Sequence, residues 1–386
     1  MKIAYVSYSY FADTDFSIVR EIRKKADLYY FIIITPYSLR TTAIDIQKQY
    51  PITGIFKPSI YPELEKFSDL FESEKTYIVN ICGNYAKLKK YFVFCKLLFL
   101  LKNMNIDVLH TTMYYSKEMF FLYCLRKKTV LTVHDPIPHS DIYSKEYLNY
   151  RQISFHYLNN FLIFNTNQKN EFISQYNLQK KNIYVSKLGV INYLYKYKNT
   201  VIQNNKDEYI LFFGRITSYK GLDYLFPAMK AVHENHKNVK LIAAGYCEKY
   251  YFDITEYKNC SYIEIANRFI PDNELVTLIQ NALFVVCPYI DATQSGVVMS
   301  AFAFNIPVLA TNVGGLSEYV EHLKSGYIVP PKDINGLAHG INYLLDNREL
   351  LNEQRNYISE KYKTGEYSWE KITDDFIGFY RKINDS

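Results

Sequence analysis

The sequence lacks most features that would assign a protein of 386 residues to a specialised class. Its six cysteines are scattered and none forms a CxxC pair, so we expect small, buried side chains in a reducing compartment. No uncharged apolar run approaches the roughly 20 residues of a transmembrane helix. There is no internal repeat or nucleic-acid motif, and the start looks like a strand and not a signal peptide. We therefore expect a cytoplasmic protein.

The sequence does have an apolar content of 48%, which is enough for sizeable cores, in a chain that is long for a single one. Two domains are therefore expected. The net charge of +6 and the pI near 8.7 are mild. They favour an anionic ligand or surface, and we expect no nucleic-acid partner.

Strand-like runs alternate with helix-like segments through the first half of the chain. This βα alternation predicts an α/β fold with a mostly parallel sheet covered on both faces. The domain is expected to span residues 1–195. Its strand candidates are residues 2–8, 27–34, 76–81, 107–112, 129–134, 160–166 and 183–190.

A polar stretch without periodicity, residues 196–207, is the expected interdomain linker. The alternation then restarts, which predicts a second Rossmann-type sheet in a domain spanning 208–365. The chain ends on a helix-like segment, residues 366–386. The strand candidates of the second domain are residues 210–215, 240–245, 283–288 and 307–311.

Two turns in the second domain have the composition of phosphate-binding turns. Residues 293–296 (TQSG) follow an apolar strand and lead into a helix-like run, so backbone N–H groups and the positive end of a helix dipole point at one place. A second turn follows the next strand, where a double glycine lets the backbone approach a ligand closely. The predicted ligand contacts of these turns are Thr293, Gln294, Ser295, Gly296, Gly314 and Gly315.

A third loop supplies cations at the end of another strand. Gly214 and Arg215 follow the strand-like run, and Lys220 precedes a helix-like one. Arg215 offers a planar fork to phosphate oxygens and Lys220 a compact point charge, so the pair could hold a diphosphate. Alone, these residues would be ordinary solvated cations, but ligands of open α/β sheets sit beyond the carboxyl ends of the strands, where all three loops fall.

These motifs together resemble the retaining glycosyltransferases of family 4. The similarity is strong from residue 209 to about 345, moderate at residues 130–140 and weak elsewhere in the first half. The resemblance implies the GT-B fold, in which two Rossmann-like domains face a central cleft and the last helix crosses back to the first domain. It also implies a nucleotide-sugar donor, UDP- or GDP-linked, bound mainly by the second domain, with the acceptor on the first.

The chain departs from the family at two positions. The family often has two glutamates eight residues apart in this region, and Ala292 and Ser300 stand at those places. Asp291 lies one residue early, and the TQSG form resembles a subset without the glutamate pair. Glu318 matches the family's glutamate after the double glycine, which implies a ribose or sugar contact. The alternative for Glu318 is a carboxylate that favours a helix N-terminus.

In the first domain, His134 and Asp135 follow a buried-looking strand and precede two prolines. They are well placed to touch the transferred sugar or the acceptor, and His134 resembles the family's cleft histidine. The alternative is a strand-end histidine that bonds only to the protein. His110 occupies a similar strand end. Asp13 and Asp15 match a DxD metal pattern of another fold, but we expect a polar loop there and no metal.

Residues 87–104 are basic and apolar without any acid. They could lie on an anionic membrane surface, which would suit a lipid-linked acceptor, but a crossover helix packed on the sheet is the preferred interpretation. The predicted function is transfer of a sugar from a nucleotide-sugar to a glycan or lipid-linked acceptor in bacterial surface polysaccharide biosynthesis, without metal or other cofactor. The alternatives are an epimerase or hydrolase, and a non-catalytic binding or scaffold subunit.

Overall fold

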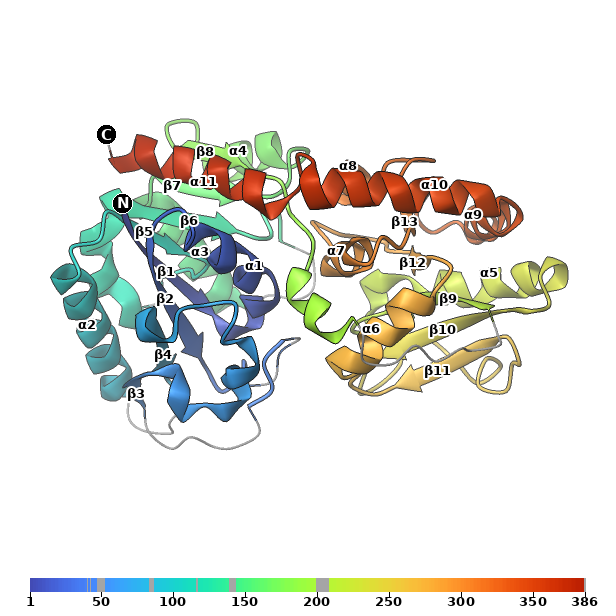
Figure 1. The fold of residues 1–386 in the computed structure, drawn as a ribbon, viewed down its shortest axis with the longest axis horizontal. Helices are drawn as coiled ribbons and strands as arrows, with labels where there is room; N and C mark the ends of the chain where they lie inside the picture. Colours follow the sequence, from blue (N-terminus) through green and yellow to red (C-terminus); the bar gives the residue numbers. More distant parts are fainter. Residues whose placement is uncertain are drawn as a thin grey trace. The chain divides into compact units, whose positions relative to one another are not determined.

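The computed structural model describes residues 1–39, 41, 43–46, 53–82, 87–115, 117–138, 144–198 and 208–384. The chain forms two compact units, which are described separately (Figure 1). Unit 1 comprises residues 1–164, 169–187 and 369–386, and unit 2 comprises residues 165–168 and 188–368. Each unit is built around one largely or wholly parallel sheet.

Unit 1 contains an eight-stranded sheet in the order β3-β4-β2-β1-β5-β6-β7-β8. All neighbours pair in parallel except β3 with β4. The central strands are almost wholly buried and rich in β-branched and aromatic residues, as a sheet covered on both faces requires. The strands are β1 (Lys2–Tyr8), β2 (Asp27–Ile34), β3 (Gly54–Phe56), β4 (Thr76–Asn80), β5 (Val108–Thr111), β6 (Thr129–Val133), β7 (Asn160–Ile163) and β8 (Asn182–Val185).

Helices from both ends of the chain cover this sheet. The last helix, α11, belongs to unit 1, where it packs on α1 and buries Trp369 and Tyr380. On another part of unit 1, α2 buries an apolar face in the sheet's core cluster. The α-helices of unit 1 are α1 (Ala12–Ile22), α2 (Lys87–Asn103), α3 (Lys145–Tyr157), α4 (Lys169–Tyr176) and α11 (Trp369–Asn384).

Unit 2 contains a six-stranded, all-parallel sheet in the order β11-β10-β9-β12-β13-β14. The chain order reverses between β9 and β12, so the loops after these two strands diverge from one point. The strands are β9 (Glu208–Phe213), β10 (Val239–Gly245), β11 (Ile263–Asn267), β12 (Val285–Cys287), β13 (Val308–Thr311) and β14 (Gly326–Val329). The helices are α5 (Leu222–Asn235), α6 (Asp272–Asn281), α7 (Gly296–Ala303), α8 (Leu316–Tyr319), α9 (Ile334–Asp346) and α10 (Arg348–Ser359).

The fold class predicted from the sequence is confirmed, and every predicted strand is present. Three strands were not predicted: β3, β11 and β14, all of which lie at sheet edges. Edge strands bury less surface, so their apolar signal is weaker; β3 is only half-buried along its whole length.

Two predicted boundaries differ from the structure. Residues 188–198 pack in unit 2, where the Ile191 N–H donates to the Met299 carbonyl at 3.3 Å. The change of unit therefore precedes the expected linker at 196–207, of which residues 199–207 lie outside the described residues. The short segment 165–168 also belongs to unit 2.

The prediction of a polar loop at Asp13 and Asp15 is wrong. Both lie in the first turn of α1, and Asp15 is fully buried. Its carboxylate accepts hydrogen bonds from the Tyr5 hydroxyl at 2.6 Å and from Ser7. Cysteine burial is also only partly as expected, since Cys124 is exposed.

Candidate functional site

The carboxyl ends of β9 and β12 in unit 2 carry the candidate site. These strands are neighbours in the sheet at the point where the strand order reverses. In open α/β sheets, such a switch point leaves a crevice between the diverging loops, and ligands bind there. The loop after β9 holds Gly214, Arg215 and Lys220, and the loop after β12 holds residues 288–295.

Lys220 is buried, although it was predicted from an ordinary loop signal. Its Nζ lies 3.7 Å from the centroid of the Tyr289 ring and 5.3 Å from that of Tyr219. Burial lowers the pKa of Lys220 to about 7, with Cys287 opposing and Arg215 adding to this shift. Aromatic faces stabilise the ammonium, but they do not replace its hydration. An anion that binds beside Lys220 would therefore stabilise its charged form.

The loops after β9 and β12 are tied together through their backbones. The Ile290 N–H donates to the Tyr219 carbonyl at 2.7 Å. Gly221 has a φ of +70°, and a Cβ added there would lie 1.9 Å from the Pro288 carbonyl oxygen. Only glycine permits this conformation and approach together. The contact fixes Lys220, one residue earlier, against the loop that leads to α7.

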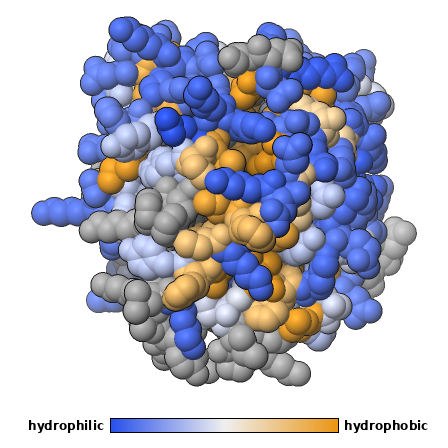
Figure 2. All heavy atoms as spheres, turned by 90° about the vertical axis from the view of Figure 1, so that its left-hand side faces the viewer, coloured by the Kyte–Doolittle hydropathy of each residue, from blue (hydrophilic) through white to orange (hydrophobic). Residues whose placement is uncertain are grey.

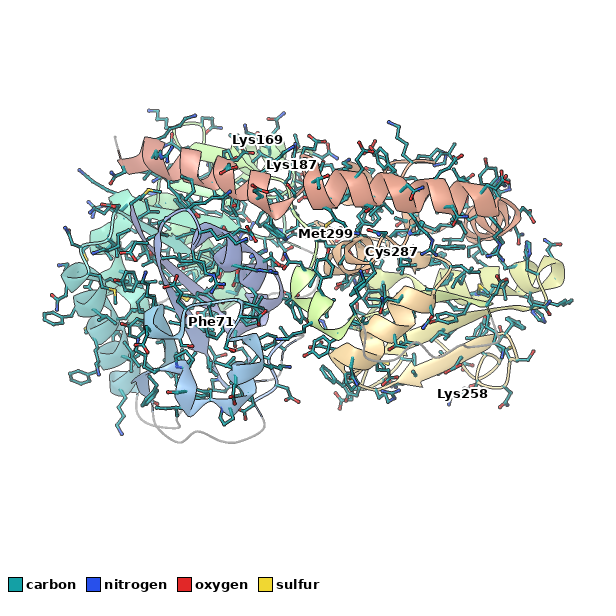
Figure 3. All side chains as sticks on the ribbon, in the orientation of Figure 1. Phe71, Lys169, Lys187, Lys258, Cys287 and Met299 are labelled. Atoms are coloured by element: carbon teal, nitrogen blue, oxygen red, sulfur yellow. The ribbon has the colours of Figure 1, made fainter. Side chains whose placement is uncertain are left out.

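The N-terminus of α7 faces an open region. Ser295 is its N-cap, and the Ser295 hydroxyl accepts from the Val298 N–H at 3.4 Å. Gly296 is exposed, and a Cβ added there would meet none of the described residues within 4 Å. Cys287 ends β12 and Met299 lies in the buried part of α7, and both are labelled in Figure 3. Backbone N–H groups at this helix start are accessible to a phosphate.

Gly314 and Gly315 pack closely against the backbone of the TQSG loop and of the residue before it. Gly314 has a φ of +50°, and an added Cβ would lie 1.4 Å from the Ala292 carbonyl oxygen. At Gly315, a Cβ would lie 2.3 Å from the Thr293 carbonyl oxygen. That carbonyl also accepts from the Asn165 side-chain amide at 2.8 Å. In this structure the two glycines therefore shape the neighbouring loop, and their predicted ligand contact stays a prediction.

Glu318 lies in the first turn of α8, and its carboxylate binds backbone. Its two oxygens accept from the N–H groups of Thr166 and Asn167 at 2.9 and 2.7 Å. Glu318 thereby holds the segment 165–168 in unit 2. Each carboxylate oxygen has a second lone pair, so a sugar or ribose hydroxyl can still donate to it.

In unit 1, His134 follows β6 directly and is partly exposed. Its ring stacks on Phe11, with centroids 3.9 Å apart and planes inclined by 13°, and Phe164 lies at 5.7 Å. Desolvation of the ring packed against these aromatic side chains lowers the pKa of His134 to about 4, against the raising effect of Asp135. At neutral pH the imidazole is therefore neutral and can donate one hydrogen bond and accept another.

A buried arginine supports the loop after His134. The Arg151 guanidinium donates to the Pro136 carbonyl, to the Tyr114 hydroxyl at 3.0 Å and to the Tyr176 hydroxyl at 3.1 Å. The central carbon of the guanidinium, Cζ, lies 5.0 Å from the centroid of the Phe155 ring. Arg151 was missed from the sequence because a lone arginine in a helix looks like a surface residue.

His110 has a structural role. It is fully buried in β5; Nδ1 bonds the Tyr380 hydroxyl, and Nε2 bonds the Thr132 hydroxyl at 2.6 Å. Both ring nitrogens are thus committed within unit 1, and burial lowers the pKa of His110 to about 3.

The structure brings most predicted donor-site residues of unit 2 into one neighbourhood. Gly214, Lys220, Thr293, Ser295 and Gly296 line the ends of adjacent strands, and Arg215 acts electrostatically on Lys220. Arg215 and Asp291 are exposed. His134 and Asp135 belong to unit 1. Among the described residues, there is no cluster of three or more His, Cys, Asp or Glu side chains that could hold a metal ion.

Tyr289 and Asn165 contribute to this neighbourhood without having been predicted. Tyr289 follows the strand-end proline and supplies the ring beneath Lys220. The sequence has 39 tyrosines, so nothing in it marked Tyr289 as a candidate site residue. Asn165 is remote in sequence, and only the fold places it beside Thr293.

The fold, with two Rossmann-like units, is of the GT-B class. HepE from Anabaena, solved in complex with UDP-glucose, superposes with a TM-score of 0.69 over 99% of this chain and 100% of its own, at 14% identity. A protein from Listeria monocytogenes described as a putative UDP-N-acetylglucosamine 2-epimerase gives a TM-score of 0.63 at 12% identity, covering 99% of this chain and 96% of its own. At such identities the likeness establishes the fold alone.

Residues 196–363 match the model of the family described as "Glycosyl transferases group 1". The predicted resemblance to glycosyltransferases is thereby confirmed, whereas family 4, its TQSG subset and the retaining mechanism stay predictions. An uncharacterized glycosyltransferase of Methanocaldococcus jannaschii is 29% identical over 191 residues, which cover 48% of this chain and 47% of the relative. The match spans about half the length of such curated relatives.

Proposed function

We propose that the chain is a retaining glycosyltransferase that moves a sugar from a UDP- or GDP-sugar to a glycan or lipid-linked acceptor, in the cytoplasm and in bacterial surface polysaccharide biosynthesis. The observation that carries the proposal is Lys220, buried over the Tyr289 ring where the loops of β9 and β12 meet. A buried ammonium without its hydration shell favours a multiply charged anion, and the diphosphate of a nucleotide-sugar is one.

The reaction breaks the bond between the anomeric carbon and the diphosphate oxygen. The electron pair of this bond leaves with the oxygen, so negative charge grows on the diphosphate while positive charge grows on the sugar. Lys220, Arg215 and the N–H groups at the start of α7 would stabilise the leaving group. No metal is required in this scheme, because the cations and the helix terminus supply the positive potential.

The remaining predicted residues keep their proposed roles. His134 and Asp135 would contact the transferred sugar or the acceptor, and a neutral imidazole suits hydrogen bonding to a hydroxyl. Asp291, Gln294 and Glu318 would contact the donor. The acceptor oxygen attacks from the face that the diphosphate leaves, its proton passes to that diphosphate, and the configuration is retained. Peripheral membrane contact through residues 87–104 belongs to the same proposal.

The test is a binding and hydrolysis panel of UDP-, GDP- and ADP-sugars. We expect saturable binding of one donor, unaffected by EDTA and weakened at least tenfold in Lys220→Met and Arg215→Ala, because each removes a charge-assisted contact. Methionine keeps the apolar stem of Lys220 over Tyr289. Lys258→Met, at an exposed site of unit 2, is the matched control.

The products decide between the enzymatic alternatives. Transfer to an added acceptor supports the proposal. Free sugar or an epimerised donor, without acceptor product, would point to the hydrolase or epimerase. A folded protein that binds no donor of the panel would contradict the diphosphate site and favour the scaffold role.

A further inference from the structure

Helix α2 (Lys87–Asn103) has an outer face that lies outside the buried core of unit 1. Its inner face is buried in the core of the sheet through Val93, Phe94, Leu97 and Leu101. This confirms the preferred interpretation of residues 87–104 as a helix packed on the sheet. It does not account for the opposite side of the helix.

Large aromatic side chains stand on that opposite side. Phe92 is 73% exposed and Phe99 is 66% exposed, the largest exposed fractions of any described phenylalanine. Exposed Lys89 and Lys96 alternate with them. The successive spacings of three, four and three residues place all four on one stripe of the helix. We call this stripe, with the cations beside it, the α2 surface.

Along α2 itself, all charged residues are cations. Residues 87–106 contain no Asp or Glu. The helical segment that packs on α2, residues 117–128, ends with exposed Arg126, Lys127 and Lys128. Lys128 Nζ donates to the Ile106 carbonyl at 2.8 Å, which brings this cationic group to the C-terminal end of α2. The face of the molecule with α2 shows apolar residues gathered among hydrophilic ones (Figure 2).

We propose that the α2 surface binds an anionic lipid membrane, with Phe92 and Phe99 inserted at the boundary of headgroups and acyl chains and with the lysines on the headgroup phosphates. Phenylalanine and lysine on one helical face suit a surface that is apolar below and anionic above. A protein partner fits less well, because the buried centre of a protein interface is depleted of lysine.

The proposed orientation is parallel to the membrane plane. Among the described residues, no helix is long and apolar enough to span a bilayer. The buried half of α2 also stays in the core of unit 1, so only the side chains of the outer stripe enter the lipid. Binding of this kind is reversible and depends on the surface charge of the lipid.

The experiment is flotation of the full chain with vesicles of phosphatidylcholine, with and without phosphatidylglycerol. We expect flotation with the anionic vesicles only, and release as ionic strength rises. Lys96→Glu should weaken binding by roughly tenfold or more, because each cation near an anionic surface contributes about a fivefold gain and the change reverses a charge. The double variant Phe92→Ser and Phe99→Ser should also lose flotation.

Matched controls lie in unit 2. Lys258→Glu and Phe269→Ser alter an exposed lysine and an exposed phenylalanine that are not part of the α2 surface, and we expect them to float as the unaltered chain does. The proposal is wrong if the unaltered chain ignores both vesicles, if the α2 variants float normally, or if only a polynucleotide or a protein partner binds the α2 surface.

This inference develops the membrane contact of the proposed function, but the two can fail separately. Flotation measures lipid binding without donor or acceptor, whereas the donor panel measures binding in unit 2. Retained donor binding and an unchanged circular dichroism spectrum in the α2 variants would show that lost flotation is not lost folding.

Discussion

Lys220 gives the site a pH dependence whose sign follows from its lowered pKa of about 7. A bound diphosphate favours the ammonium form, so binding must protonate the side chain wherever it is neutral beforehand. We expect diphosphate affinity to be nearly constant below pH 7 and to weaken by about tenfold per pH unit above it. Isothermal calorimetry in buffers of different ionisation enthalpy should detect proton uptake of up to one proton per nucleoside diphosphate near pH 8.

The control for this prediction is Lys220→Arg, since a guanidinium stays charged throughout the range. The variant should bind the nucleoside diphosphate without proton uptake. Its affinity should be lower at every pH if the larger guanidinium does not fit the pocket. Uptake that persists in Lys220→Arg would assign the proton to another group and contradict the role given to Lys220.

Asp15 makes the stability of unit 1 depend on pH in the opposite sense to an ordinary ion-paired carboxylate. Burial raises its pKa to about 8, although the bonds from Ser7 and Tyr5 lower it. The folded state then holds a proton that the unfolded state releases above its pKa of about 4. The protonated Asp15 therefore contributes stability at low pH. This contribution to the free energy of unfolding falls by about 1.4 kcal/mol per pH unit between the unfolded pKa of about 4 and the folded pKa of about 8.

Asp15→Asn tests this account. The amide mimics the protonated acid: its oxygen can accept from Tyr5 while its NH₂ group donates to Ser7. We expect urea titrations to give a free energy of unfolding that falls less steeply between pH 5 and pH 8 than in the unaltered protein. Equal slopes in the two proteins would mean that Asp15 is ionised when buried.

At the scale of elements, α7 offers a substitution that separates folding from binding. A Cβ at Gly296 meets no described atom, and alanine is the better helix former by about 0.5–1 kcal/mol. Gly296→Ala should therefore fold with unchanged or higher stability. Its methyl group would nevertheless stand at the helix N-terminus where the phosphate must approach, so donor affinity should fall by about tenfold or more in fluorescence titrations.

Gly378→Ala is the matched control, because a Cβ there also meets no described atom and the residue lies in α11 of unit 1. It should gain similar stability and leave donor affinity unchanged. If Gly296→Ala binds the donor normally, the start of α7 does not contact the phosphate.

The regular elements were predictable because burial and periodicity act over short stretches of sequence. The strands β1 and β2 have the predicted bounds, since each is a continuous buried run. The first turn of α1 was missed because its aspartates look like loop residues until Tyr5 and Ser7 are brought to Asp15. The sequence also predicted the loops of the donor site, but not the ring beneath Lys220, since pairing Lys220 with Tyr289 requires β9 and β12 to be neighbours.

At the scale of the whole molecule, the chain completes unit 1 with its last residues. Helix α11 buries Phe376 and Tyr380, and the Phe379 ring stacks on Tyr184 with centroids 4.9 Å apart. The Tyr380 hydroxyl bonds Nδ1 of His110, which is fully buried. Composition showed that these residues were apolar, but their packing against strands formed more than 180 residues earlier is a property of the fold.

A chain that ends at Ser368 should therefore lose stability in unit 1 and keep unit 2 folded. Without α11, His110 loses its partner Tyr380 and an apolar face of the sheet is exposed to water. The combined loss in the free energy of unfolding should exceed that of an ordinary point substitution. In hydrogen exchange followed by mass spectrometry, we expect β5 and β6 to lose protection while β9 and β12 retain it. Nucleotide-sugar binding by unit 2 should persist in the same sample.

Tyr380→Phe separates the buried hydrogen bond from the packing of the helix. It keeps the ring and leaves one nitrogen of His110 unsatisfied, which should lower the free energy of unfolding by about 1–3 kcal/mol without the loss of exchange protection at low denaturant. If the truncated chain protects β5 and β6 as fully as the intact chain does, then α11 is not part of the cooperative unit of the first sheet. A loss of protection in β9 and β12 as well would instead mean that the two units unfold together.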